Sequence, residues 1–324
     1  MDELRRTSRA SAWPALSRYA LYDWLAACPF IAKVYNQTYS PALYRQSLHE
    51  AQAEHYPLVI SLGLLRRQKY ARLARRISRD GFVAGHTKRV RPLDVFTHMA
   101  YANLDVKIPA YDVSINNVQH ISDIYAEWFS MLFGIEIPPA DRFPFVDTPP
   151  TWKHQALRQV AEWGFSDRRI IFLNSFSKGE ERNWPLESIV ELVIAMRRHE
   201  RWRDSAFVVN AVPEEMGRLQ TILSRYSLDD VRVFSAIENF FELPALLSLC
   251  DLVISVETAT MHLANAVHVP VVALVRQRNP EWMPIDRGNS TVIAVAGPED
   301  WVETIPVEQV MSTLRALPEK SCPN

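Results

Sequence analysis

The chain has 324 residues, of which 48% are hydrophobic, and its formal net charge at pH 7 is −1. This composition supplies enough apolar side chains for sizeable cores, so it excludes a disordered protein and favours one or two folded domains. No run of about eighteen apolar residues occurs, and no apolar stretch follows the first charges, so we expect neither a membrane-spanning helix nor a secretory signal. A cytoplasmic protein is the prediction.

The N-terminal half alternates short strands with helices. Residues 1–50 contain proline breakers and predict helical or irregular structure. Residues 55–62 predict a buried strand, residues 64–77 an amphipathic helix and residues 79–85 a second strand. Further along, apolar residues recur at three- and four-residue steps and predict an amphipathic helix that ends at Gly134.

Positive charge is concentrated in one part of this half. Between Arg66 and Arg91 there are ten Lys or Arg residues against a single acid, Asp80. Such a surface can attract phosphorylated lipid, or it can simply be the solvated face of a helix. No RNA- or DNA-binding motif accompanies the cluster, so nucleic acid is not an expected partner.

A proline-rich stretch at residues 135–152 predicts a linker between two domains, which we place at residues 1–150 and 151–324. The three cysteines, Cys28, Cys250 and Cys322, are far apart and form no CxxC pair. They predict neither a disulfide framework nor a zinc site.

The second half alternates continuous β-branched runs with helical segments. The predicted strands are residues 168–175, 205–212, 231–236, 251–256, 269–275 and 290–295. The predicted helices are residues 186–199, 213–226, 241–250, 260–268 and 306–317. Buried strands in alternation with helices indicate a parallel sheet covered on both faces, the doubly wound α/β arrangement. In such sheets ligands bind at the carboxyl ends of the strands.

The first strand-end loop, residues 174–185, leads into a helix whose start is marked by Pro185. Its hydroxyls and cations are Ser175, Ser177, Lys178 and Arg182. Together with the positive end of a helix dipole, these groups suit a diphosphate. Loops rich in Ser and Lys are also common as plain turns, and that interpretation stays open.

The second strand-end loop follows the predicted strand at residues 251–256. Glu257 could accept hydrogen bonds from ribose hydroxyls, and His262 could donate to a phosphate oxygen at a helix N-terminus. The alternatives are that Thr258 is the N-cap, Glu257 a partner of the helix dipole and His262 an ordinary interior histidine.

Two quoted segments carry a resemblance to a known family. "DLVISVETATMHLANAVHVPVVAL" and "IIFLNSFSKGEERNWPLESIVELVIAMRR" resemble, in the same order, two motifs of the bacterial lipopolysaccharide heptosyltransferases, glycosyltransferase family nine. The likeness covers nearly all of residues 165–295, and a weaker likeness extends into the N-terminal half.

The resemblance implies an α/β fold of two Rossmann-like domains that face a cleft, the glycosyltransferase B arrangement. The C-terminal domain would bind a nucleotide sugar, usually ADP-heptose, and the N-terminal domain a lipopolysaccharide-type acceptor. Transfer would be inverting and would need no metal or other cofactor. The donor-binding residues that the resemblance implies are Ser175, Ser177, Lys178, Arg182, Glu257, Thr258, Ala259 and His262.

The sequence departs from the family at several points. The early strand and glycine-aspartate loop that normally carry the candidate base are not found, so we expect an incomplete or divergent N-terminal domain and assign no catalytic residue. Asp23, Asp94 and His98 are possible substitutes. The family's Asp is Glu257 here and its Gly is Ala259, so the affinity for the donor or its identity can differ.

Three hypotheses follow. The first is an active glycosyltransferase that moves heptose or a related sugar to a lipid-linked or glycan acceptor, with the basic region 66–91 at the inner face of the inner membrane. The second is a non-catalytic homologue that binds the donor and acts as a scaffold or regulator. The third is another nucleotide-sugar enzyme, such as an epimerase.

Overall fold

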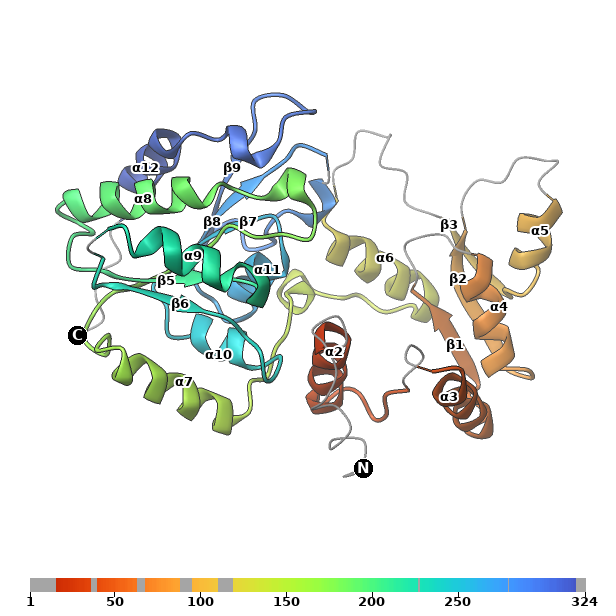
Figure 1. The fold of residues 1–324 in the computed structure, drawn as a ribbon. Helices are drawn as coiled ribbons and strands as arrows, with labels where there is room; N and C mark the ends of the chain where they lie inside the picture. Colours follow the sequence, from red (N-terminus) through yellow and green to blue (C-terminus); the bar gives the residue numbers. More distant parts are fainter. Residues whose placement is uncertain are drawn as a thin grey trace. The chain divides into compact units, whose positions relative to one another are not determined.

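The structure is a computed structural model, and Figure 1 shows its ribbon. The described residues are 16–35, 40–62, 68–87, 95–109, 119–226, 228–278 and 280–318. Two compact units are present. Unit 1 comprises Met1–Cys28, Gln119–Asp123 and Ile137–Asn324, and unit 2 comprises Pro29–Val118 and Ile124–Glu136. Asp94, Cys322 and the start of the helix predicted at residues 64–77 lie outside the described residues.

Unit 1 is built on a six-stranded sheet in which every neighbouring pair of strands is parallel. Its strands are β4 (Ile170–Asn174), β5 (Ala206–Asn210), β6 (Val231–Phe234), β7 (Leu252–Val256), β8 (Val271–Val275) and β9 (Ser290–Ala294). Every residue of β4, β7 and β8 is buried. Continuous apolar runs are needed here because helices cover both faces of these strands.

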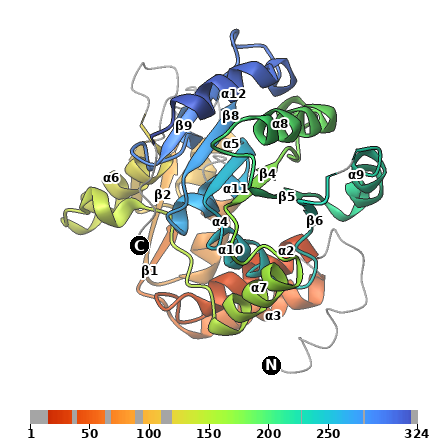
Figure 2. The same ribbon diagram turned by 90° about the vertical axis from the view of Figure 1, so that its left-hand side faces the viewer.

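Two groups of helices cover the sheet, and two apolar cores result (Figure 2). One face packs against α8 (Leu186–Arg198), α9 (Met216–Leu223) and α12 (Val307–Ala316). The other packs against α7 (Pro150–Glu162), α10 (Glu242–Leu247) and α11 (Ala259–Ala266). The remaining elements of unit 1 are α2 (Leu16–Ala27) and single turns at Pro139–Arg142, Glu180–Arg182, Pro213–Glu215, Pro280–Trp282 and Val302–Thr304. The predicted doubly wound domain is therefore confirmed.

The strand order of this sheet, β6-β5-β4-β7-β8-β9, has a reversal at its centre. From β4 the chain moves outward through β5 and β6, returns to β7 beside β4, and then moves outward in the opposite direction. The helices that follow β4 and β7, α8 and α11, therefore pack on opposite faces of the sheet. This reversal is where a doubly wound sheet binds its ligand.

Unit 2 has a smaller parallel sheet of order β1-β2-β3 in its described part. The strands are β1 (Leu58–Ser61), β2 (Phe82–Thr87) and β3 (Val106–Pro109), and the helices are α3 (Pro41–Ala53), α4 (Gln68–Ile77), α5 (Val95–Tyr101) and α6 (Ile121–Phe133). Ala71 and Ala74 of α4 pack on Val83, Tyr101 and Leu104 to form the core. Helix α6 ends before Gly134, whose φ of 64° is the left-handed C-terminal conformation that the sequence predicts.

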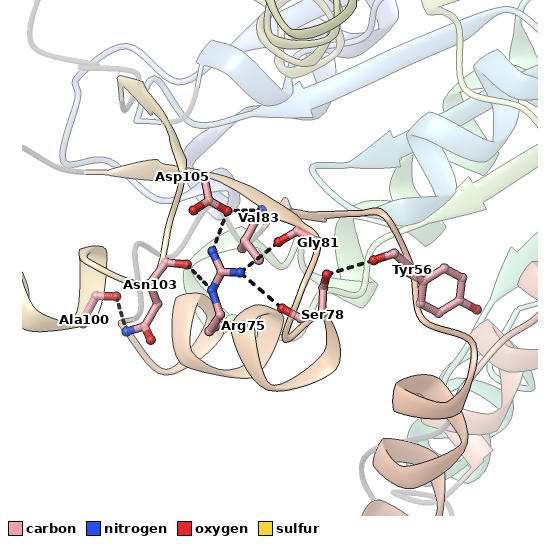
Figure 3. A network of polar contacts seen from close by, with 8 residues as sticks. All are labelled: Tyr56, Arg75, Ser78, Gly81, Val83, Ala100, Asn103 and Asp105. Carbon is pink, nitrogen blue, oxygen red and sulfur yellow. Dashed lines mark hydrogen bonds and ion pairs between the residues drawn. The ribbon is translucent and has the colours of Figure 1, made fainter.

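One arginine of the basic region is a structural brace of unit 2 (Figure 3). Nη1 of Arg75 donates to the carbonyl oxygen of Gly81 at 2.9 Å, and Nε donates to the carbonyl oxygen of Asn103 at 3.1 Å. The guanidinium also pairs with Asp105, which accepts a bond from the main-chain N–H of Val83. That N–H bond and Arg75 hold the pKa of the Asp105 carboxyl below its usual range. Arg75 thus joins α4 to the turns before β2 and β3.

The predicted elements are found in the described residues, but α5, β3 and α7 were not predicted. Helix α7 begins at Pro150, inside the stretch that we interpreted as a linker, because proline is well suited to the first turn of a helix. Strand β3 and helix α5 are only 4 and 7 residues long, too short for a clear periodicity. Within the described ranges, no helix combines the length and apolar character that crossing a bilayer requires.

Replacing Arg75 with Ala should destabilise unit 2 by ~2 kcal/mol, since three main-chain carbonyls and a carboxylate lose a charged donor. Urea unfolding followed by circular dichroism measures the change. Arg72→Ala is the matched control, because Arg72 is on the same helix but exposed. Equal unfolding free energies for the two variants would contradict the role of Arg75.

Candidate functional site

The candidate site lies at the carboxyl ends of β4 and β7, the two central strands of the unit 1 sheet. We call residues 175–185, which follow β4, the β4 loop, and residues 257–259, which follow β7, the β7 turn. Asn174 and Ser255 are paired in register where these strands end. Both segments singled out from the sequence therefore emerge side by side at the reversal of strand order.

Asn174 connects the two segments through its side chain. Its Nδ2 lies 3.1 Å from Oγ of Ser255 and 3.1 Å from Oγ1 of Thr258, and its Oδ1 accepts a bond of 2.8 Å from Nδ2 of Asn210. Asn174 is buried, so these bonds form where water does not compete. The last residue of β4 thereby determines the position of the β7 turn.

The β4 loop is closed by its own hydrogen bonds. The main-chain N–H of Trp184 donates to the carbonyl oxygen of Ser175 at 3.0 Å, and that of Ser177 donates to Oδ1 of Asn183 at 2.6 Å. The Trp184 ring is buried, and its Nε1 donates to the carbonyl oxygen of Ile305 at 2.9 Å. These contacts hold both ends of the loop at the start of α8.

Four residues of the β4 loop were predicted to bind phosphate, and their environments differ. Lys178 is exposed, whereas Ser177 and Arg182 are half-buried. Ser175 is fully buried, and its Oγ has no hydrogen-bond partner. Nε of Arg182 is also buried without a hydrogen-bond partner. Buried polar atoms without a partner are uncommon in native proteins, and a bound ligand group is one explanation for them.

The β7 turn combines a helix cap with a buried carboxylate. Thr258 is the N-cap of α11, and its Oγ1 accepts a bond from the main-chain N–H of Thr260. Glu257 is buried, and its Oε2 accepts a bond of 3.4 Å from the main-chain N–H of Arg276. Ala259, the first residue of α11, is exposed and its φ is not positive. Its backbone therefore does not require glycine.

His262 lies in the first turn of α11. Burial and, to a smaller extent, the nearby His120 together lower the pKa of His262 to about 4. The ring meets Trp282 edge-on, with centroids 6.2 Å apart. His262 is consequently neutral at pH 7, so it can donate one hydrogen bond to a ligand but contributes no positive charge.

Arg276 is a further site residue that the sequence interpretation missed. It follows β8 directly, and its Nη1 lies 3.4 Å from Oε1 of Glu181 in the β4 loop. The Arg276 side chain is largely withdrawn from solvent, and that of Glu181 is half-buried. Arg276 could have been predicted as a site residue because it follows the carboxyl end of the predicted strand at residues 269–275. Our prediction considered only the loops after the strands at residues 168–175 and 251–256.

The possible substitutes for the catalytic base lie in different units. Asp23 is on α2 in unit 1, and its Oδ2 accepts a bond of 3.0 Å from Nδ2 of Asn239. His98 is on α5 in unit 2 and is exposed. Asp94 lies outside the described residues.

The arrangement as a whole is suited to an anionic ligand. The cations of the β4 loop, Arg276 and the first amides of α11 all belong to segments at the same edge of the sheet. Guanidinium groups and helix N-termini both favour phosphate oxygens. A nucleoside diphosphate group is the ligand that this chemistry fits best.

Comparison with known proteins points to one family. The model of glycosyltransferase family 9 (heptosyltransferase) matches residues 112–300. This span includes the β4 loop, the β7 turn and Arg276. No curated protein matches the sequence.

Solved structures share the fold at low sequence identity. A family 9 glycosyltransferase from Veillonella parvula superposes with a TM-score of 0.72 at 17% identity, covering 92% of this chain and 85% of the other. The Escherichia coli heptosyltransferase WaaC with ADP gives 0.62 at 17% identity, covering 93% and 88%. E. coli ADP-heptose lipopolysaccharide heptosyltransferase II gives 0.59 at 16%, covering 84% and 79%. The α/β fold with two Rossmann-like domains, of glycosyltransferase B type, is confirmed.

Replacing Asn174 with Ala should lower the free energy of unfolding by ~2–3 kcal/mol, because Ser255, Thr258 and Asn210 would lose a buried partner. Chemical denaturation measures this loss. Asn210→Ala removes one bond at a half-buried position and should cost ~1 kcal/mol or less. If the Asn174 variant were no less stable than the Asn210 variant, Asn174 would not be the link between the two segments.

Proposed function

The chain belongs to glycosyltransferase family 9, and from this premise we propose that it transfers a heptose or related sugar from a nucleotide-diphosphate donor. The observation that carries the proposal is the juxtaposition of the β4 loop and the β7 turn at the reversal of strand order, tied together by Asn174. ADP-heptose is the proposed donor, in keeping with E. coli WaaC, which is described with ADP and with ADP-2-deoxy-2-fluoro heptose. The proposed acceptor is a lipopolysaccharide-type or other glycan.

In the proposed reaction the bond between the anomeric carbon and the diphosphate oxygen breaks as an acceptor hydroxyl oxygen attacks from the opposite face. The anomeric configuration is therefore inverted, and the acceptor proton passes to a general base. Negative charge grows on the leaving diphosphate. Lys178, Arg182 and the N-terminus of α11 would stabilise that charge, so we propose that no metal ion or other cofactor is needed.

Each residue of the proposed donor site has a distinct task. Arg182, Ser177 and Ser175 would bind phosphate oxygens, with Lys178 nearby. Glu257 would accept from ribose hydroxyls. Ala259 would offer its main-chain N–H at the start of α11, and His262 would donate from a neutral ring. Thr258 would act as the cap that keeps the α11 amides in place.

Calorimetric titration with ADP-heptose, ADP, UDP and GDP tests the donor site. We expect ADP-heptose and ADP to bind, and Arg182→Ala and Glu257→Gln each to weaken binding about tenfold or more, because each removes a charged hydrogen-bonding partner. Arg315→Ala is the control, since Arg315 pairs with Glu308 on α12, away from the β4 loop.

The outcomes separate the hypotheses. Binding together with transfer to a core acceptor in the presence of EDTA, with inversion seen by NMR of the product, would support the full proposal. Binding without transfer would identify a non-catalytic homologue. An altered free sugar released without acceptor would indicate an epimerase, and no binding to any nucleotide would refute the donor site.

We also propose that unit 2 contacts the inner face of the inner membrane in the cytoplasm through its basic region. Lys69, Arg72, Arg76 and Arg79 are exposed on or just after α4. Helix α5 shares a core with α4 and exposes three apolar side chains, Val95, Phe96 and Met99, the second of them to 78%. Apolar side chains beside cations are typical of a surface that binds anionic lipid.

Sedimentation with vesicles tests this contact. Wild type should bind vesicles that contain phosphatidylglycerol and not vesicles of phosphatidylcholine alone, and added salt should weaken binding. The double variant Phe96→Ser/Met99→Ser should bind several-fold less, since roughly 25 cal/mol is lost per Å² of apolar area that no longer inserts. Phe30→Ser is the control, because Phe30 is 80% exposed in unit 2 but precedes α3. Equal losses in both variants would refute a specific membrane face.

A further inference from the structure

Two arginines in the candidate site share a single carboxylate. Nη1 of Arg276 lies 3.4 Å from Oε1 of Glu181, and Nε of Arg182 lies 3.7 Å from the same oxygen. The side chain of Arg276 is only 11% exposed. Glu181 and Arg182 belong to the single turn Glu180–Arg182 in the β4 loop, whereas Arg276 follows β8. Two strand ends are thereby linked through one carboxylate oxygen.

This pairing leaves donors of both arginines unused. Charge-assisted bonds between guanidinium and carboxylate normally measure about 2.7–2.9 Å, so both contacts are long. Nε of Arg182 and Nε of Arg276 are buried without a hydrogen-bond partner, as is Oγ of Ser175. Each of the two arginines therefore keeps a donor that a further acceptor can use. The cluster therefore has the capacity to accept further negative charge.

Arg276 is also connected to the other half of the site. Its main-chain N–H donates to Oε2 of Glu257, which belongs to the β7 turn. Strand β8 pairs with β7 in the sheet, so Arg276 and Glu257 leave adjacent strand ends. The cluster of Arg182, Glu181 and Arg276 thus joins the β4 loop to the end of β8, and Arg276 also contacts the β7 turn.

We propose that Arg276 binds the diphosphate of the donor together with Arg182, and that Glu181 is an internal counter-ion which the diphosphate displaces. This inference rests on the proposed function. A diphosphate carries two adjacent anionic groups, each able to accept from one guanidinium, and so matches the two arginines better than one carboxylate does. Displacement of Glu181 makes the unused donors of both arginines available to phosphate oxygens.

Gly179 leaves the space that the Glu181 carboxylate occupies. A Cβ atom added at Gly179 would stand 2.5 Å from Oε1 and 2.8 Å from Cδ of Glu181. The absence of a side chain at residue 179 therefore lets the Glu181 carboxylate turn toward the arginines. The φ of Gly179 is −106°, a value that alanine also adopts, so Gly179→Ala would move the carboxylate without straining the backbone.

Calorimetry with ADP and with inorganic pyrophosphate, on the full chain and its variants, tests the proposal. Pyrophosphate reports on the diphosphate subsite without contacts to base or ribose. Arg276→Gln should weaken the binding of both probes about tenfold or more. Glu181→Gln and Gly179→Ala should each strengthen it, by about threefold to tenfold, because the competing internal anion is removed or displaced. A gain of affinity cannot be produced by loss of folding.

The controls are neighbours of the same chemical type. Arg278→Gln changes an arginine two residues further on that is half-exposed and pairs with Glu299, and Glu180→Gln changes the exposed carboxylate next to Glu181. Both should leave the affinity for ADP and for pyrophosphate unchanged. A thermal unfolding midpoint for each variant distinguishes lost binding from lost structure.

The results also separate this inference from the proposed function. If wild type bound no ADP, the donor site itself would be refuted. If wild type bound ADP and Arg276→Gln bound it equally well, Arg276 would have no part in the site. If Glu181→Gln bound pyrophosphate with unchanged or lower affinity, Glu181 would be a structural brace and not a displaceable counter-ion.

Discussion

The buried amide of Asn174 is the interaction on which the candidate site depends. Two strands that are far apart in sequence end beside each other at the centre of the sheet, and the loops that leave them diverge. Asn174 donates to Ser255 and Thr258 and accepts from Asn210, so it joins the ends of β4, β7 and β5. Because an amide offers both donors and acceptors, one side chain can satisfy several neighbours in a space that excludes water. The cations of the β4 loop and the first turn of α11 are consequently held at one edge.

Within that framework, the electrostatics of the site favour an anion without relying on histidine. Burial holds the pKa of His262 near 4, so that ring is neutral under ordinary conditions. Positive potential comes instead from guanidinium groups, which remain charged at any working pH, and from the amides at the start of α11. Two carboxylates reduce this positive potential. Glu257 accepts a hydrogen bond from the main-chain N–H of Arg276, and Glu181 lies beside the guanidinium groups of Arg182 and Arg276. In the site, fixed cations are therefore opposed by two carboxylates, of which Glu181 lies on a single short turn.

Sequence patterns predicted much of unit 1, and the reason is physical. Strands buried on both faces require continuous apolar runs. Segments such as β4, β7 and β8 can therefore be recognised as strands from the sequence alone, without knowledge of the tertiary structure. Helix α7 was not predicted because the prolines at its start were interpreted as part of a linker. Strand β3 was not predicted because it is too short to show an alternation of apolar and polar residues. In the site, the residues after β4 and β7 were found because each follows a recognisable strand. Arg276 and Glu181 were not paired in advance, since their contact depends on strand order, which no local pattern encodes.

The departures from the family motif become understandable once Arg276 is included. Glu257 stands where the family has Asp, and its longer side chain reaches the main-chain N–H of Arg276 at the end of the neighbouring strand. Ala259 stands where the family has Gly, yet its backbone is in an ordinary conformation and its N–H remains at the start of α11. The substitutions therefore preserve the helix N-terminus while they connect the β7 turn to β8. Because Glu257 accepts a hydrogen bond from the main chain of Arg276, changes at residues 257 and 276 are expected to be coupled rather than independent.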